Sequence, residues 1–269
     1  MEKEKLIGLK PYQKEDTDFF YGREKEVEGL LQILQKDRLV TLIGAPGTGK
    51  SSLINAGLIP RLENGFLAQA GKQWSVCKLR PGISPIENLA YSLTSEGSLK
   101  LEGKANTEDF SDYYQRLKDL ASLGLIDIYT KSQVNKKKNL LIVIDQLEDL
   151  FTFNRFFDSD ESDQDDLLFN VVARTIKIKD TAIYFVLVIQ SNYISHLSQY
   201  TKLQEIISKS QYAIPGFSKA GIKEIVEKNF LGQGISFSQE SFKTISNSLT
   251  DDPTLLPNMQ FLFKEILNK

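Results

Sequence analysis

Short apolar runs rich in β-branched residues alternate along the chain with segments of helical periodicity. Each of the longer runs has the length and composition of a strand that is buried on both faces of a sheet. A shorter run further along is a fifth candidate strand. We therefore predict a mostly parallel, five-stranded sheet. The runs cover residues 39–43, 74–79, 140–144, 182–189 and 212–214.

The segments between the apolar runs carry apolar residues at the spacing i, i+3, i+4 and i+7. This spacing is typical of a helix that packs one face on a core. It occurs at residues 27–34, 86–93 and 110–117. Strands that alternate with helices favour a three-layer α/β/α fold with a parallel sheet.

The pattern changes at Pro215 and Gly216, which break the chain after the last candidate strand. Only helical spacing follows, at residues 222–226, 242–249 and 256–266. We therefore predict an α/β domain over residues 1–215 and a small helical subdomain over residues 216–269. The last helical pattern runs on without a glycine or proline stop, so we expect the subdomain to be incomplete and to continue in a longer parent protein.

The composition is that of a globular protein, with 41% hydrophobic and 25% charged residues. A net charge of -2 gives no field to hold a phosphate backbone, so nucleic acid is not an expected partner. We find no signal-peptide core and no run of apolar residues of membrane-spanning length, and expect a cytoplasmic protein without a membrane partner. Cys77 and His196 are each the only residue of their kind, which argues against an internal disulfide and against Ser-His-Asp catalysis.

Residues 44–51 read GAPGTGKS and match the phosphate-binding motif G-x-x-x-x-G-K-[ST] in full. The glycines let backbone amides turn inward around a phosphate, and the start of the following helix adds its positive dipole end. Lys50 would bridge the β- and γ-phosphates, and the Ser51 hydroxyl would bind Mg²⁺. A glycine-rich turn with a chance lysine is the alternative. We predict nucleotide contacts from Gly44, Ala45, Pro46, Gly47, Thr48, Gly49, Lys50, Ser51 and Ser52.

A second acidic motif, LLIVIDQLEDLF, places Asp145 at the end of a buried strand. A carboxylate there is costly unless a cation or hydrogen bonds await it, so we predict that Asp145 holds Mg²⁺ as the Walker B acid. Glu148 and Asp149 follow within one turn, and either can activate the attacking water. Glu148 is preferred, because a helical turn would return it to the side of Asp145. The alternative is that these two acids are only charges at the start of a helix.

Several segments together resemble the STAND class of signal-transduction P-loop NTPases, and within it the novel STAND subgroup. The resemblance implies a P-loop NTPase fold followed by a helical lid. It also implies that Gly22 and Arg23 contact the base or the phosphates, and that Pro257 touches the nucleotide. The segments are GLKPYQKEDTDFFYGREKEVEGLL, WSVCKLRPGISPIENLA, VIDQLEDLFTF and LPNMQFLF.

The same resemblance implies a switch, in which ADP holds a closed form and exchange for ATP opens it for homo-oligomerisation. Effector or repeat domains are then expected elsewhere in the parent chain. Adenine is expected over guanine, because no Asn-Lys-x-Asp motif lies downstream of the acidic motif.

The strand over 182–189 is followed by Gln190, where the resembled family has an arginine. Arginine would bring a permanent charge to the γ-phosphate, whereas a glutamine amide binds one oxygen or positions water. We therefore predict that Gln190 senses the γ-phosphate and that Mg-dependent hydrolysis of ATP is slow. The alternative is that Gln190 only satisfies backbone groups at the strand end.

Two other functions remain open at this point. One is a hydrolysis-deficient interaction scaffold that is locked around its nucleotide, which the glutamine at position 190 favours. The other is a mechanical ATPase of the AAA+ kind. It would need an arginine supplied in trans, for which Arg155 is the candidate.

Overall fold

The structure is a computed structural model that describes residues 10–95, 99, 106–132, 138–153, 162–217, 219–230, 238, 240, 243–244 and 247. The chain forms two compact units. The first comprises Met1–Leu31, Gly44–Asn64 and Ala213–Lys269, and the second comprises Gln32–Ile43 and Gly65–Tyr212. The domain boundary at residue 215 stays a prediction, and the helical pattern at 256–266 lies outside the described residues.

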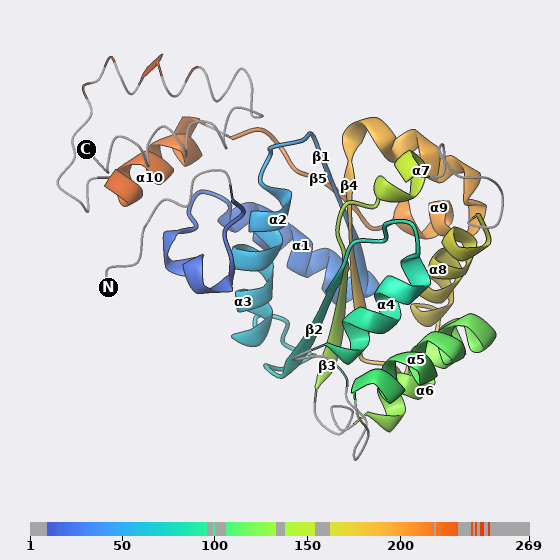
Figure 1. Ribbon diagram of the computed structural model, residues 1–269. Helices are drawn as coiled ribbons and strands as arrows, with labels where there is room; N and C mark the ends of the chain where they lie inside the picture. The colour runs from blue at the N-terminus through green and yellow to red at the C-terminus, as the bar shows by residue number, and fades with distance from the viewer. Residues whose placement is uncertain are drawn as a thin grey trace. The chain divides into compact units, whose positions relative to one another are not determined.

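A five-stranded parallel sheet has the strand order β2-β3-β4-β1-β5. The register pairs Cys77 of β2 with Ile142 of β3, and Ile142 with Phe185 of β4. Figure 1 shows β2, β3 and β4 side by side. The α/β fold is confirmed, and the sheet is parallel throughout rather than mostly so. The strands are β1 (Leu39–Gly44), β2 (Trp74–Leu79), β3 (Asn139–Ile144), β4 (Ile183–Gln190) and β5 (Gln211–Ala213).

The central strands form where the sequence is apolar on both faces. Every residue of β1 and of β3 is buried, and residues 185–189 of β4 are buried as well. Runs of this kind, rich in valine, isoleucine and leucine, suit a strand whose two faces are both covered. The carboxyl ends of these parallel strands therefore present a row of loops at one edge of the sheet.

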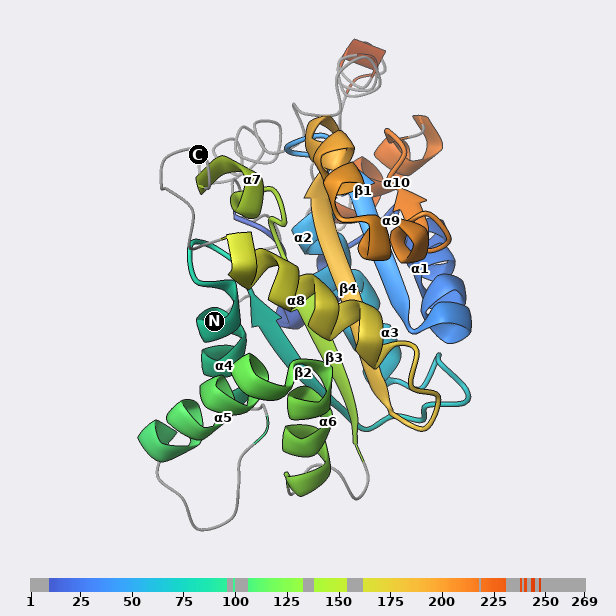
Figure 2. The same ribbon diagram turned by 90° about the vertical axis from the view of Figure 1, so that its right-hand side faces the viewer.

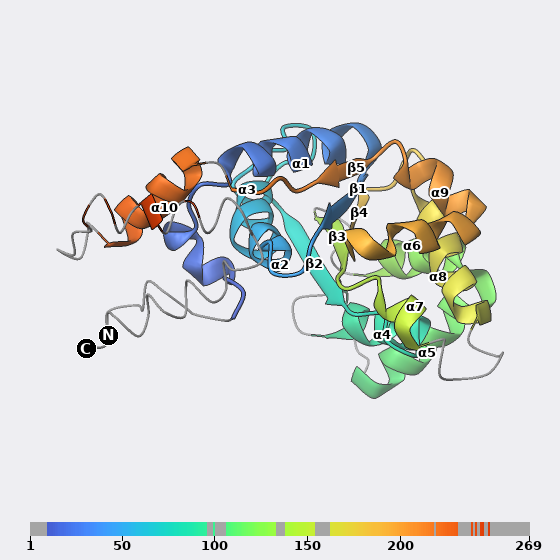
Figure 3. The same cartoon turned by 90° about the horizontal axis from the view of Figure 1, so that it is seen from above.

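Helices α4, α5, α6 and α8 gather on one face of β2, β3 and β4 (Figures 2 and 3). They pack in sequence, α4 on α5, α5 on α6, and α6 on α8. The predicted helices at 86–93 and 110–117 are confirmed as α4 and α5. The helices of the second unit are α4 (Pro85–Thr94), α5 (Asn106–Leu120), α6 (Ser122–Lys131), α7 (Asp149–Phe153), α8 (Ser162–Thr175), the 3-10 helix η4 (Ser191–Gln199) and α9 (Thr201–Ile207).

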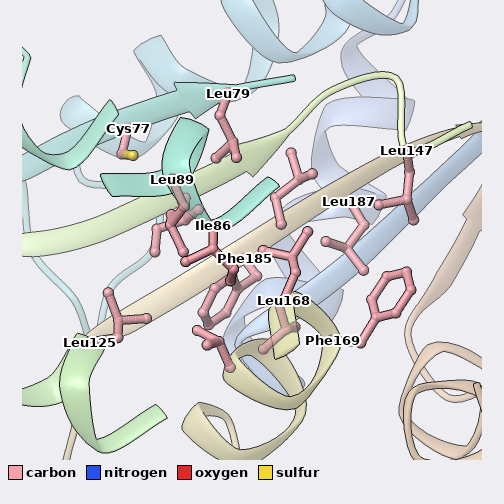
Figure 4. Close-up of a cluster of buried hydrophobic side chains, with 14 of the residues drawn as sticks. Cys77, Leu79, Ile86, Leu89, Leu125, Leu147, Leu168, Phe169, Phe185 and Leu187 are labelled. Atoms are coloured by element: carbon pink, nitrogen blue, oxygen red, sulfur yellow. The ribbon is translucent and has the colours of Figure 1, made fainter. Parts of the chain in front are cut away.

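The core of the second unit lies between the sheet and these helices (Figure 4). Phe185 and Leu187 of β4 project from the strand into a cluster that includes Leu168 of α8 and Leu89 of α4. Burial of these side chains is worth about 1.5–3 kcal/mol each. The core therefore holds the sheet edge, and the loops on it, in a defined place.

The first unit is built around the helical run that follows the glycine-rich motif. This run, Lys50–Glu63, contains a π turn at its centre. Pro60 lies just after the π turn, and the wider turn accommodates a residue that has no N–H to donate and a ring that crowds the preceding turn. The run consists of α2 (Lys50–Ser52), the π turn η2 (Leu53–Leu58) and α3 (Ile59–Glu63). The first unit also contains the 3-10 helix η1 (Lys14–Phe19), the first part of α1 (Glu24–Asp37) and α10 (Lys219–Phe230).

The N-terminal segment packs on this helical run at a glycine. A Cβ atom at Gly57 would lie 2.7 Å from Val27 Cγ2 and 3.0 Å from Phe20 Cε1. The Tyr12 N–H donates to Ser52 Oγ at 3.1 Å, which ties the start of the segment to the same run. The motif helix and the N-terminal segment are therefore one packed body.

In the part of the chain that the structure describes, no helix combines the length and apolar character needed to span a bilayer.

Arg38 connects the start of β1 with the loop that precedes β4. Its backbone is left-handed, with φ of 54°, and its carbonyl accepts the Phe185 N–H at 2.9 Å. Its guanidinium donates to the carbonyls of Ile176, Ile178 and Thr181 at 2.6–2.7 Å. One side chain therefore satisfies three loop carbonyls at the amino end of β4.

We expect Arg38→Gly to lower the free energy of unfolding by about 2–4 kcal/mol, because it leaves three carbonyls without their charged donor. Glycine accepts the left-handed backbone without steric strain, so the substitution does not distort the turn, and the greater freedom of glycine in the unfolded chain is included in the expected loss. Urea unfolding measures it. Arg174→Ala, at an exposed position of α8, is the control. An unchanged urea midpoint for Arg38→Gly would contradict a stabilising role of the hydrogen bonds from Arg38 to the loop carbonyls.

Candidate functional site

The glycine-rich motif forms a tight loop that leads from β1 into the helical run. Gly47 and Gly49 have φ of 75° and 85°, the left-handed region that side chains disfavour. Thr48 Oγ1 donates to the Ala45 carbonyl at 2.8 Å and closes the loop. Gly49 caps the run, whose first amides have no partners within the helix. Such a helix start is an anion site.

Lys50 lies in the first turn of the run and folds over the loop. Its Nζ donates to the carbonyls of Gly44 and Ala45, at 2.9 and 2.8 Å. Lys50 as a residue is half-buried, and its ammonium group donates to neutral acceptors. It therefore places a positive charge at the loop, where phosphate oxygens can compete for its donors.

Gly44 is needed for space rather than for a left-handed backbone. A Cβ atom there would lie 2.2 Å from Ile214 Cγ2 and 2.9 Å from Thr48 Oγ1. Ile214 follows β5 and is buried. The sequence indicated only a short apolar run at residues 212–214, with no signal that its last residue packs on the motif.

Ser51 and Ser52 occupy the first turn of the run and are both half-buried. The Ser52 hydroxyl accepts the Tyr12 N–H. Ser51 is the position of the predicted Mg²⁺ ligand, and its hydroxyl has the oxygen chemistry that Mg²⁺ prefers. Its role and that of Ser52 stay predictions.

In the second unit, the chain turns sharply at the end of β3. The Asp145 N–H donates to the Leu79 carbonyl at 2.9 Å, and its Oδ1 accepts the Gln146 N–H at 3.0 Å. Gln146 has φ of 58°. The Leu147 N–H then donates to the Val188 carbonyl at 2.9 Å, so the chain crosses from the β2 side to the β4 side within two residues.

Glu148 is buried at the end of β4. Only 6% of the residue is exposed, and its Oε2 accepts the Gln190 N–H at 3.1 Å. The sequence suggested a helical turn from Asp145 to Glu148, but α7 begins at Asp149 because the left-handed Gln146 interrupts the helix. Glu148 is held by the β4 backbone instead.

Asp149 is the second acid of the pair and is half-buried. Burial raises the pKa of its carboxyl above 3.8, the charges of Glu148 and Asp145 raise that pKa further, and Arg80 opposes them. A raised pKa brings a carboxylate closer to the basicity that proton transfer requires. The part of Asp149 in activation of water stays a prediction.

Gln190 is the last residue of β4 and is half-buried. Its backbone N–H donates to the Glu148 carboxylate, so Gln190 orients Glu148. The contact of its side chain with a γ-phosphate stays a prediction.

Gly22 and Arg23 lie in the first unit beside α10 and the motif. Gly22 has φ of 78°, and a Cβ atom there would lie 3.0 Å from the Gly221 carbonyl oxygen. Arg23 is 2% exposed. Its Nη1 donates to Glu26 and to the Pro215 carbonyl, at 2.9 and 2.8 Å. Contact of these two residues with a nucleotide stays a prediction, and Pro257 and Arg155 lie outside the described residues.

Comparison with known proteins identifies the class of this chain. Residues 7–269 match the family model Novel STAND NTPase 1. The chain therefore belongs to the novel STAND NTPases, a family of P-loop NTPases. The resemblance noted in the sequence is confirmed. A search of curated proteins finds no match.

Solved structures support the fold. The chain is similar to a Walker-type ATPase of Pyrococcus abyssi, with a TM-score of 0.57 and 17% identity, over 95% of this chain and 69% of that chain. It is also similar to the ORC2 protein of Aeropyrum pernix in its ADPNP-ADP complexes, with a TM-score of 0.50 and 17% identity. That match covers 77% of this chain and 51% of the ORC2 chain.

We expect Asp149→Asn to raise the unfolding temperature at pH 7 in EDTA, because it removes a charge that the folded state disfavours. The folded pKa lies above 3.8, the ordinary value of an aspartate carboxyl, so wild-type stability falls as pH rises through that folded pKa. The advantage of the variant should shrink below about pH 4, where both states are protonated. Asp180→Asn, at an exposed loop position, is the control. An advantage that persists unchanged at low pH would contradict this origin.

Proposed function

We propose that this chain is an ATP/ADP switch with slow, Mg-dependent hydrolysis that controls signalling or oligomerisation. The observation that carries the proposal is the motif loop. Gly47 and Gly49 are left-handed, Gly49 caps the helical run, and Lys50 lies over the loop in the first turn of the run. This arrangement offers backbone amides, a helix dipole and an ammonium group to a phosphate chain.

Mg²⁺ is assigned to the Ser51 hydroxyl and the Asp145 carboxylate. These oxygen donors fit a hard cation that keeps several waters and binds substrate phosphates. When bound, the ion would neutralise charge on the phosphates. Asp145 lies at the carboxyl end of a fully buried strand, where its Oδ1 accepts the next N–H. This hydrogen bond orients the carboxylate.

Slow turnover follows from the groups at the end of β4. Glu148 accepts a backbone N–H, which restrains the carboxylate that would activate water. Gln190 supplies no charge to a transition state that gains from one. The same two facts favour a second candidate, a nucleotide-locked scaffold that does not turn over. Steady-state phosphate release distinguishes the two.

The proposed setting is a larger cytoplasmic protein whose other domains act as effectors, with homo-oligomers in the ATP state. Membership of the family supports the switch. The nucleotide is ATP or ADP rather than GTP, for lack of a guanine-reading motif in the sequence.

We expect Lys50→Ala to weaken ATP binding by about tenfold to a hundredfold, because it removes charged hydrogen bonds to the phosphates. Isothermal titration calorimetry with ATP, in the presence of Mg²⁺, measures the affinity for ATP. Lys25→Ala, at an exposed position of α1, should bind as the wild type does. Wild-type affinity in Lys50→Ala would refute the site, and equal affinity for GTP in competition would refute the choice of ATP.

We expect Gln190→Arg to increase phosphate release, by up to about 10³-fold if the new guanidinium reaches the γ-phosphate. Glu148→Gln should reduce whatever release remains, because an amide cannot accept the proton. Single-turnover assays on both variants measure the rates. Release that neither substitution changes would assign hydrolysis to other residues.

A further inference from the structure

Arg23 is a buried cation that no phosphate-binding motif accounts for. It is 2% exposed, and its guanidinium meets three separate stretches of the first unit. Nη1 donates to Glu26 of α1, at 2.9 Å, and to the Pro215 carbonyl, at 2.8 Å. Nη2 lies 3.5 Å from the Thr48 carbonyl of the phosphate loop, at the long end of the hydrogen-bond range. Its guanidinium carbon lies 3.5 Å from the centre of the Phe217 ring.

Arg23 contacts the phosphate loop itself through the Thr48 carbonyl. The Thr48 C=O and the Gly49 N–H belong to one planar peptide and point in opposite directions. A cation on the carbonyl side therefore fixes which way the Gly49 N–H points. It also polarises that N–H, because hydrogen bonds in series strengthen each other. The side chain acts on the loop from behind, opposite to the face that the amide presents.

Two further contacts of Arg23 fall on residues 214–217, which lie between β5 and α10 and are termed the linker. The Pro215 carbonyl and the Phe217 ring bind the guanidinium, and Phe217 is buried. Ile214 fills the space that Gly44 leaves at the start of the phosphate loop. The linker therefore contacts the loop directly through Ile214 and indirectly through Arg23.

Helix α10 continues from the linker and packs on the residue before Arg23. A Cβ atom at Gly22 would lie 3.0 Å from the Gly221 carbonyl oxygen and 3.2 Å from Ile225 Cγ1. Ile222 is fully buried. A shift of the linker relative to Arg23 would therefore also shift the start of α10.

We propose that Arg23 is a positioning residue that couples the Thr48–Gly49 peptide to the linker. Resting on the proposed nucleotide site, the inference is that a bound phosphate fixes this peptide, Arg23 follows the Thr48 carbonyl, and the Pro215 carbonyl and Phe217 ring follow Arg23. The nucleotide state thereby reaches α10 through one side chain. Arg23 serves here as a link behind the loop and not as a group that touches the phosphates.

Hydrogen exchange of backbone amides on the full chain, with and without Mg-ADP or Mg-ATP, tests the coupling. In the wild type we expect nucleotide to slow exchange in peptides over residues 45–53 and also over residues 214–222, each by about fivefold or more. In Arg23→Gln we expect slowing over 45–53 to remain and the response over 214–222 to fall below about twofold. A purely structural role would change exchange equally with and without nucleotide.

Phe217→Leu provides a second variant, because it removes the aromatic face and leaves an apolar side chain in the same place. It should also lose the response over residues 214–222, even if Arg23→Gln does not fold. Lys25→Ala, on the exposed side of the same helix as Glu26, is the control and should respond as the wild type does. Arg23→Lys keeps the charge without the fork and should respond to an intermediate extent.

A full response over residues 214–222 in both Arg23→Gln and Phe217→Leu would overturn the coupling. A wild type that shows slowing over residues 45–53 but not over 214–222 would also overturn it, while leaving the nucleotide site intact. No slowing over 45–53 in the wild type would instead refute the proposed function.

Discussion

The backbone has to pass from a fully buried strand into a helix within five residues, 45–49, and the site depends on that constraint. So tight a turn requires left-handed backbone at Gly47 and Gly49, which only glycine adopts at little cost. It also brings the start of the helix to the end of β1, where the amides of a first turn point away from the helix. Lys50 can lie over the loop because the turn is this tight.

A second constraint arises from the acids that follow β3. Three carboxylates lie within five residues, and burial, followed by the charges of the other two acids, raises the pKa of Asp149. Backbone N–H groups compensate two of them, that of Gln146 for Asp145 and that of Gln190 for Glu148. The left-handed turn at Gln146 separates the two acids, so each finds its own donor. Three neighbouring carboxylates destabilise the fold, and a cation bound at this strand end would reduce their repulsion.

The first unit shows how a phosphate loop can be joined to segments distant in sequence. Gly44 and Gly22 each lack a side chain where another segment makes close contact, Ile214 at the former and the Gly221 carbonyl at the latter. Arg23 is a buried cation between these segments, with the Glu26 carboxylate and the Phe217 ring as partners. Close packing of this kind transmits small displacements, because a packed interior has little room to absorb them.

Much of this protein follows from its sequence alone. The strands were found within one residue of their bounds, because a strand buried on both faces must be apolar along its whole length. The phosphate loop was found because few residue types can form that turn. The family was found because its motifs are short-range patterns that a sequence displays directly.

The partners of these residues were decided only by the tertiary structure. That Glu148 binds the Gln190 backbone depends on β3 and β4 being neighbours in the sheet, which no local pattern states. The sequence suggested a nucleotide contact for Arg23, but its engagement with Pro215 spans 192 positions of the chain. Gly44 reads as a loop glycine, and the space taken by Ile214 appears only once the chain is folded. Local chemistry selects which elements form, whereas long-range packing selects which side chains meet.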